Sequence, residues 1–258
     1  MSNLKISREG TVELITINRP DKLNALNRAT INELGEAVTN ASASKEVTAI
    51  VITGAGDKAF VAGADIAEFA AYSAEEGKSL SLSGQKKLFD LIENTGTPVI
   101  AAINGFALGG GLELAMACHI RLASENARMG LPEVSLGVIP GYGGTQRLAQ
   151  LVGKGKAIEM IATAGMIKAD EAMQFGLLNH VVKAEELIDK AMEIAHQISK
   201  NSTVAIAAAI RAVNAGFKDG QNGFDKEIEE FGNCFGTADF KEGTTAFLEK
   251  RKANFPGK

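Results

Sequence analysis

The chain has no tryptophan and only 2 cysteines, 5 prolines and 3 histidines among its 258 residues. The cysteines, Cys118 and Cys234, cannot form a disulfide framework and lack metal-type spacing, so a reducing compartment is the simpler interpretation. His119, His180 and His196 lie too far apart for an H-x-x-x-H ligand pair. We therefore expect neither a disulfide scaffold nor a metal site.

Long apolar runs and basic blocks are also missing. No apolar run approaches membrane-spanning length, and the N-terminus enters a strand pattern without the features of a signal peptide. The net charge is −4, the pI is about 5.6, and no Lys/Arg-rich block precedes residues 250–252. We expect a cytoplasmic protein that takes neither nucleic acid nor membrane as its main partner.

Three common enzyme signatures are absent. No G-x-G-x-x-G motif follows a strand, since residues 141–146 break its spacing, and residues 153–156 do not end as a P-loop does. No serine lies in a G-x-S-x-G motif. The sequence therefore lacks the usual signatures of dinucleotide binding, of nucleoside triphosphate binding and of a serine nucleophile.

What is present is the composition of a folded α/β protein. Hydrophobic residues make up 45% and charged residues 22%, which suits one large domain or a domain with an appendage. Apolar alternation or short apolar runs predict a hairpin and several buried strands, at residues 4–8, 12–17, 49–53, 99–103, 120–124 and 177–182. Helical spacing predicts a helix from residue 30, another over 73–93, and mainly helices in the last third.

Residues 104–117 are the most informative stretch. Three glycines, residues 109–111, stand between a predicted strand and an apolar helix, where unobstructed N–H groups can bind an anion or a developing oxyanion. The small residues of 59–66, with Asp65 as a candidate N-cap, and the glycines of 140–146 predict similar turns. The simpler alternative is that the glycines only allow close packing or flexibility.

Two carboxyl groups stand in confined contexts. Glu113 lies among Leu, Ala and Met in the first turn of the predicted helix, where an ionised carboxylate is costly unless it is paired, solvated or used. Glu133 follows Pro132 in a constrained turn. Two N–H donors suit the enolate oxygen of a thioester, and two carboxyl groups suit proton transfer at the adjacent carbons. Taken singly, Glu113 could be a solvated helix-face residue and Glu133 an ordinary turn residue.

Several motifs together resemble those of the enoyl-CoA hydratase/isomerase (crotonase) superfamily. They are residues 18–20, 24–26, 59–66, 104–113, 131–133 and 139–148. The likeness runs from the first strand to residues 247–252. It implies an α/β fold, a spiral of ββα units over residues 1–195 that carries the active site. It also implies a C-terminal helical trimerisation region over 196–258, and a homotrimer or a homohexamer built as a dimer of trimers.

The resemblance also implies roles for individual residues. The N–H groups of Ala64 and Gly110 would form the oxyanion hole, Glu113 would activate water and Glu133 would give a proton to Cα. Residues expected to contact the substrate or its coenzyme A are Lys22, Leu23, Ala25, Ala62, Gly63, Ala64, Asp65, Ile66, Gly110, Pro132, Gly141, Tyr142, Phe247 and Lys250. Phe247 and Lys250 often come from a neighbouring subunit, although residues 250–252 could also be only a solvated charge run. No metal or separate cofactor is implied, because coenzyme A is part of the acyl-CoA substrate.

The resemblance is greatest to the family's short-chain hydratases. It implies reversible addition of water to trans-2-enoyl-CoA, giving 3-hydroxyacyl-CoA, in fatty-acid or related acyl-CoA metabolism. Retention of both glutamates favours a hydratase over the family's isomerases and thioester hydrolases. Three alternatives stay open, namely an enoyl-CoA isomerase, a hydratase of the methylglutaconyl-CoA type and a non-catalytic acyl-CoA-binding homologue. Tyr142 stands where well-studied hydratases often carry a smaller residue, which leaves the acyl-chain preference open.

Overall fold

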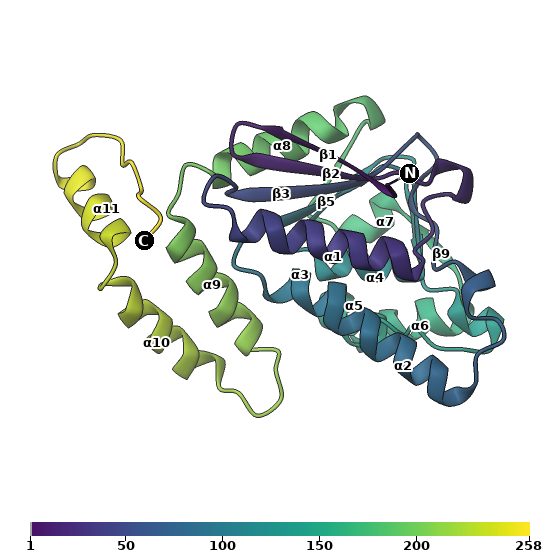
Figure 1. Cartoon of the computed structure of the whole chain (residues 1–258). Helices are drawn as coiled ribbons and strands as arrows, with labels where there is room; N and C mark the ends of the chain where they lie inside the picture. The colour runs from purple at the N-terminus through teal and green to yellow at the C-terminus, as the bar shows by residue number, and fades with distance from the viewer. Residues whose placement is uncertain (1) are drawn as a thin grey trace.

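The computed structural model describes residues 2–258 and is built on a six-stranded sheet (Figure 1). The predicted hairpin is confirmed, with β1 antiparallel to β2 and Leu4 opposite Ile17, and every later strand joins in parallel. The strand order is β1 (Leu4–Glu9), β2 (Val12–Ile17), β3 (Ala49–Gly54), β5 (Val99–Ile103), β7 (Ile120–Ser124) and β10 (His180–Val182).

Side chains alternate between the two faces of this sheet, so each face buries its own apolar cluster. On β3, Ile50 and Ile52 face a cluster with α1 (Arg28–Ala43) and α4 (Gly110–Ala117). Ala49 and Val51 face α8 (Leu187–Ile198) on the other side. Figure 1 shows α8 on one side of the sheet and α1 on the other. Both faces are therefore covered, as a parallel sheet requires.

A second sheet of four short strands repeats the order of the first. Its order is β4 (Ala59–Val61), β6 (Phe106–Leu108), β8 (Arg128–Gly130) and β9 (Met166–Lys168). β4 follows β3, β6 follows β5 and β8 follows β7, and helical segments follow each pair. These helical segments are η2 (Ile66–Glu68) with α2 (Ala74–Gly84), α4, and η4 (Glu133–Leu136) with α5 (Gly144–Val152). The expected spiral of ββα units is thus confirmed.

Three predicted elements differ in detail. The strand at 99–103 does not pass directly into the glycine helix, because β6 lies between them. The helix predicted over 73–93 is interrupted by a π-helical turn, η3 (Gln85–Phe89), before α3 (Asp90–Asn94). Of the strand predicted at 177–182, only residues 180–182 form a strand, β10, although Leu177 and Leu178 are buried. Each difference concerns a segment too short to show its own periodicity.

The elements not yet described are all helical. Between β8 and α8 lie α6 (Lys154–Thr163), α7 (Ala169–Gln174) and η5 (Ala184–Glu186), and η1 (Pro20–Lys22) precedes α1. The predicted late helices are α9 (Thr203–Ala215), α10 (Gly223–Cys234) and α11 (Ala238–Leu248), which extend to one side of the sheets (Figure 1). In the described part of the chain, no helix is long and apolar enough to cross a membrane.

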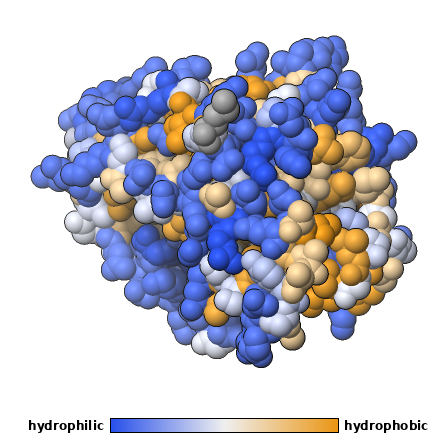
Figure 2. All heavy atoms as spheres, turned by 45° about the vertical axis from the view of Figure 1, so that its right-hand side comes forward, coloured by the Kyte–Doolittle hydropathy of each residue, from blue (hydrophilic) through white to orange (hydrophobic). Residues whose placement is uncertain are grey.

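The division expected at residue 195 falls inside α8. Ala195 is buried against the sheet together with Leu187 and Ala191, so α8 packs with the ββα core. The next helix, α9, begins at Thr203 and contributes no residue to the apolar cluster on this face of the sheet. The first residue of the expected core range, 1–195, lies outside the described residues. Figure 2 shows a face on which apolar residues gather in a patch beside a largely hydrophilic surface.

Candidate active site

Three parallel strands of the second sheet bring the predicted site residues to one edge. Val61 of β4 is in register with Ala107 of β6, and Leu108 of β6 is in register with Gly130 of β8. Parallel strands end at the same edge of a sheet, so the segments that follow them are neighbours. Ala64 follows β4, Gly110 follows β6 and Glu133 follows β8.

Leu26 ties the turn that carries Ala64 to the start of α4. Its N–H donates to the carbonyl of Gly63 at 2.9 Å, and it forms a parallel bridge with Ala64. Its Cδ1 lies 3.8 Å from where a Cβ on Gly110 would be. Among residues 2–258, no hydrogen bond occupies the N–H of Ala64 or of Gly110. Gly110 opens α4, whose first N–H groups have no intrahelical partner and carry a partial positive charge.

Two of the three central glycines are required by close contacts. A Cβ on Gly111 would lie 2.0 Å from the carbonyl oxygen of Val61, which holds α4 against β4. Gly109 has φ +51°, in the left-handed region, and a Cβ there would lie 2.7 Å from Oε1 of Glu133. The packing explanation for these glycines is therefore confirmed, and the same close packing brings the turn after β6 near Glu133.

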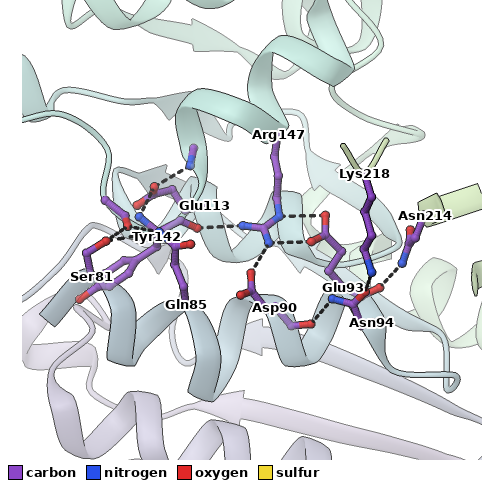
Figure 3. A network of polar contacts seen from close by, with 12 residues as sticks. Ser81, Gln85, Asp90, Glu93, Asn94, Glu113, Tyr142, Arg147, Asn214 and Lys218 are labelled. Atoms are coloured by element: carbon purple, nitrogen blue, oxygen red, sulfur yellow. Dashed lines mark hydrogen bonds and ion pairs between the residues drawn. The ribbon is translucent and has the colours of Figure 1, made fainter. Parts of the chain in front are cut away.

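Glu113 lies in the first turn of α4 and is only 1% exposed. Its Oε1 accepts hydrogen bonds from the N–H of Tyr142 at 2.7 Å and of Gly144 at 2.8 Å (Figure 3). Burial raises the pKa of Glu113 to about 7 despite these two donors; the nearby charge of Glu133 also raises it, and the charge of Arg147 lowers it. The solvated helix-face alternative is wrong for this residue.

Glu133 begins η4 and is half-buried. Burial raises the pKa of its carboxyl group above the usual range. In the described chain its Oε2 is buried and has no hydrogen-bond partner, which is costly for an acceptor unless a ligand or water uses it. Its Oε1 lies 2.7 Å from where a Cβ on Gly109 would be, so the carboxyl group of Glu133 lies beside the start of α4, the helix that carries Glu113.

The ring of Tyr142 fills the space beside these groups. It stacks on Phe89, with ring centroids 4.6 Å apart and an interplanar angle of 11°. A Cβ on Gly84 of α2 would lie 2.3 Å from Cε1 of the ring, and a Cβ on Gly110 would lie 3.6 Å from its Cδ2. Burial is the main cause that raises the pKa of its hydroxyl group to about 12. Tyr142 therefore presents a neutral, tightly held ring next to the free N–H of Gly110.

The loop expected to contact coenzyme A is joined to the turn after β4. The N–H of Ala62 donates to the carbonyl of Leu23 at 3.0 Å, and the N–H of Asp65 donates to the carbonyl of Leu26 at 2.7 Å. Arg19 donates to the carbonyl of Ala25 and forms an ion pair with Asp65 at 3.0 Å. The structure thus brings together most of the expected binding residues, namely Lys22, Leu23, Ala25, Ala62, Gly63, Ala64, Asp65 and Ile66.

The side chain of Asp65 does not cap a helix as predicted. It makes no capping hydrogen bond at the start of η2, and its carboxylate instead pairs with Arg19. The ion pair with Arg19 thus takes the place of the expected capping interaction.

Two more of the expected binding residues lie in the turns that carry Tyr142 and Glu133. The carbonyl of Gly141 accepts hydrogen bonds from Ser81 at 2.5 Å and from Gln85 at 2.8 Å, and Pro132 immediately precedes Glu133.

Two predicted binding residues lie elsewhere in the single chain. Phe247 is 83% exposed near the end of α11, and Lys250 follows that helix. Figure 1 shows α11 on the opposite side of the molecule from α2 and α6. Within one chain, these two residues are not brought to the turns described above.

Sequence reasoning assigned no role to two buried polar residues. Asn24 donates to the carbonyls of Ala55 at 3.0 Å and Ala59 at 2.8 Å, and so holds the expected coenzyme A loop. Arg147 donates to the carbonyl of Tyr142 at 2.8 Å. Both residues lie inside motifs that support the family resemblance, and this was the one sequence feature that could have marked them as important.

Among residues 2–258, no group of three or more His, Cys, Asp or Glu side chains is arranged to hold a metal ion.

The ββα spiral thus carries two free N–H groups, the buried carboxyl group of Glu113 and the half-buried one of Glu133 at one edge of its second sheet. The chain belongs to the enoyl-CoA hydratase/isomerase family, whose model matches residues 7–258. It is 49% identical to the short-chain-enoyl-CoA hydratase of Clostridium acetobutylicum over 253 residues, covering 98% of this chain and 97% of that protein. It is also 49% identical over 257 residues to the crotonyl-CoA hydratase of Syntrophomonas wolfei, covering 99% of this chain and 98% of the relative. The crystal structure of an enoyl-CoA hydratase from Bacillus anthracis superimposes with a TM-score of 0.93 at 39% identity, covering 99% of this chain and all of that one.

Proposed function

We propose that this protein is an enoyl-CoA hydratase, which adds water to a trans-2-enoyl-CoA and yields a 3-hydroxyacyl-CoA. The observation that carries the proposal is the placement of Glu113 and Glu133 at the sheet edge that also offers the free N–H groups of Ala64 and Gly110. The hydratase names of relatives that match nearly the whole chain support the same reaction.

The proposed chemistry follows from these four groups. The N–H groups of Ala64 and Gly110 bind the thioester carbonyl oxygen and stabilise the negative charge that develops there. Ionised Glu113 takes a proton from water as the water oxygen forms a bond to Cβ. Protonated Glu133 gives its proton to Cα, so the double bond becomes a single bond and one water molecule is added. Burial raises the pKa of Glu113 to about 7, which suits a group that takes up a proton, and burial also raises the pKa of Glu133, the direction that suits a proton donor.

We further propose that the reaction uses no metal and no cofactor beyond the coenzyme A of its substrate. Two proton transfers and stabilisation of an enolate complete the bond changes without oxidation or reduction. The linked loops at Lys22–Ala25 and Ala62–Ile66 are proposed to contact coenzyme A. The free thiols of Cys118 and Cys234 suit the proposed cytoplasmic location.

The helices after residue 195 are proposed to form the oligomerisation region of a homotrimer or a dimer of trimers. They expose large apolar side chains, including Phe224, Ile228, Phe231, Phe247 and Leu248. Exposed apolar surface of this extent is typical of interfaces between chains. In such an assembly, Phe247 and Lys250 of one subunit reach the active site of a neighbouring subunit, because within a single chain they lie away from that site.

The direct test is to mix the protein with crotonyl-CoA and follow the absorbance of the conjugated enoyl thioester. We expect the absorbance to fall and the product mass to rise by one water. A product of unchanged mass would indicate an isomerase, and binding without any turnover across straight-chain and branched substrates would indicate a non-catalytic homologue. Either result would contradict the proposal.

A further inference from the structure

The two N–H groups that hold Glu113 belong to a turn whose carbonyls are also fixed. Arg147 of α5 donates from Nη1 to the carbonyl of Tyr142 at 2.8 Å. Ser81 and Gln85 fasten the neighbouring carbonyl of Gly141 to α2 and its π-helical continuation. Figure 3 shows this turn between Glu113 on one side and Arg147 on the other. The peptide that Arg147 holds, between Tyr142 and Gly143, lies between the two peptides whose N–H groups donate to Glu113, so a displacement of Arg147 disturbs both donors.

Arg147 is itself held by two acids on the segment before β5. Its Nε and Nη2 donate to Glu93 at 3.0 and 2.8 Å, and Nη2 also pairs with Asp90 at 3.0 Å. The residue is 7% exposed. A forked, bidentate Arg–carboxylate pair fixes the plane of the guanidinium group, which a lysine at the same place would not do.

The next contact leads to the C-terminal helices. Asn214 of α9 donates from its side chain to the carbonyl of Glu93 at 2.6 Å, and Lys218 donates to Asn94 at 2.7 Å (Figure 3). A cavity of about 730 Å³ lies between α9 and the core, and Arg147, Glu93, Asn214 and Lys218 all line it. Because this space separates α9 from α5, the polar contacts at Glu93 and Asn94 connect the two parts across it.

We propose that Arg147 is a positioning residue for Glu113, and that α9 helps to set its place through Asn214 and Glu93. The inference rests on the proposed function, in which Glu113 activates water. Arg147 does not touch Glu113 in this arrangement. It acts by holding the Tyr142–Gly143 peptide, which fixes the two flanking peptides so that the N–H groups of Tyr142 and Gly144 meet the carboxylate.

The charge of Arg147 gives this role a signature in the pH profile. The charged or titratable groups around Glu113 are Glu133 from η4, Tyr142 from the turn and Arg147 from α5, and of these Arg147 lowers the pKa of Glu113. Loss of Arg147 removes that charge and loosens both N–H donors, and each change raises the pKa of Glu113. Because Glu113 works ionised, the acid limb of kcat/KM moves to higher pH.

The test compares Arg147→Gln, Arg147→Lys and Asn214→Ala with the unmodified enzyme. For Arg147→Gln we expect kcat for crotonyl-CoA to fall by roughly 10- to 100-fold, KM to change little, and the acid limb of kcat/KM to move to higher pH. Arg147→Lys restores the charge without the fork and should give an intermediate result. Asn214→Ala should shift kcat in the same direction by a smaller factor.

Arg211→Gln is the matched control. Arg211 makes a bidentate pair with Glu230 at 2.8 and 2.6 Å and also belongs to α9, but it has no link to the Tyr142 turn. It should lower Tm and leave the acid limb in place. If Arg147→Gln also lowers only Tm, with kcat and the acid limb unchanged, Arg147 is merely structural and the inference is wrong.

A readout without turnover separates this inference from the proposed function. Titration of the Glu113 carboxyl by carbon NMR in the unmodified enzyme, Arg147→Lys and Arg147→Gln gives its pKa directly. A higher pKa in Arg147→Gln supports the positioning role even if no enoyl-CoA is hydrated. An unchanged pKa overturns it even if hydration is observed. If Arg147→Gln fails to fold, the same titration is made on Asn214→Ala and Arg147→Lys. An unchanged pKa of Glu113 in both variants would contradict the positioning role.

Discussion

Glu113 is held at a cost to stability. Its carboxyl is buried, and burial raises its pKa from 4.5 to about 7 although two N–H groups donate to it. An unfolded chain ionises this group near 4.5, so the folded state binds more protons between these two pH values. The contribution of Glu113 to the free energy of unfolding is therefore greatest below about 4.5 and is lost as the pH rises to about 7. Function at this site opposes stability.

Glu113→Gln should therefore stabilise the protein at alkaline pH. A neutral amide oxygen can still accept from the Tyr142 turn and carries no charge into the buried site. We expect the variant to gain up to about 3 kcal/mol over the unmodified protein above about pH 8, with the difference disappearing below about pH 4.5. Thermal denaturation across this range measures it. A variant that is less stable at alkaline pH would contradict the burial argument.

Tyr142 should limit the length of the acyl chain. Its ring stacks on Phe89, contacts Gly84 and lies beside Gly110, whose N–H is proposed to bind the thioester carbonyl. Tyr142→Ala removes the ring while keeping the backbone N–H that donates to Glu113. We expect kcat/KM for C8 to C12 enoyl-CoAs to rise relative to crotonyl-CoA by about tenfold or more, because each added methylene gains apolar contact. Tyr142→Phe is the control and should keep the original ratio. An unchanged ratio in Tyr142→Ala would show that another wall sets the limit.

At this scale, the sequence was informative where a residue conflicted with its surroundings. A carboxyl in an apolar helix and another after Pro132 marked Glu113 and Glu133 as candidates, and the structure places both in confined positions. Arg147 gave no such signal, because an arginine in an amphipathic helix is ordinary until its partners are known. Asp90, Glu93 and Tyr142 are its partners, and they come from segments that only the tertiary fold brings together.

Among the elements, the contact between α4 and β4 depends on the absence of a side chain. Gly111→Ala would place a Cβ 2.0 Å from the carbonyl of Val61. We expect it to destabilise the protein by about 1–3 kcal/mol, the usual cost of overpacking, and to lower kcat by shifting the N–H of Gly110. Denaturant unfolding and crotonyl-CoA kinetics measure the two effects.

Gly155→Ala is the control for this substitution. Gly155 lies in α6, and its added Cβ would meet nothing within 4 Å. The change should be neutral or stabilising by up to about 1 kcal/mol, with kinetics unaffected. If Gly111→Ala behaves like Gly155→Ala, the close approach of α4 and β4 has no role in the site.

Sequence periodicity predicted the longer elements, but it did not predict the shortest ones. Alternation over β1 and β2 and the apolar runs of β3, β5 and β7 each span five or six residues, enough to define a face. The strands of the second sheet have three residues each, which is less than two periods of alternation. Their formation depends on pairing with one another, and so the sheet that aligns the site could not be predicted from local pattern.

For the whole molecule, the exposed apolar side chains of α10 predict assembly with further copies of the chain. Phe224, Ile228 and Phe231 recur at helical spacing along α10, Phe235 follows as its C-cap, and Phe231 is 67% exposed. The double substitution Ile228→Asp and Phe231→Asp puts charge on this stripe. We expect it to convert a trimer or hexamer into smaller species in light scattering coupled to size exclusion. The paired substitution Leu136→Asp and Val138→Asp, at exposed apolar positions outside the C-terminal helices, is a control for surface charge. If the unmodified protein is monomeric, the C-terminal helices have another role.

The most direct test of the central claim is turnover of crotonyl-CoA by Glu113→Gln and Glu133→Gln, measured beside the affinity of each variant for the same thioester. Two acids acting on one substrate predict that each variant loses at least about 10³-fold in kcat, while the dissociation constant changes by less than about tenfold. Rapid hydration by either variant would contradict the claim that both carboxyl groups perform the reaction.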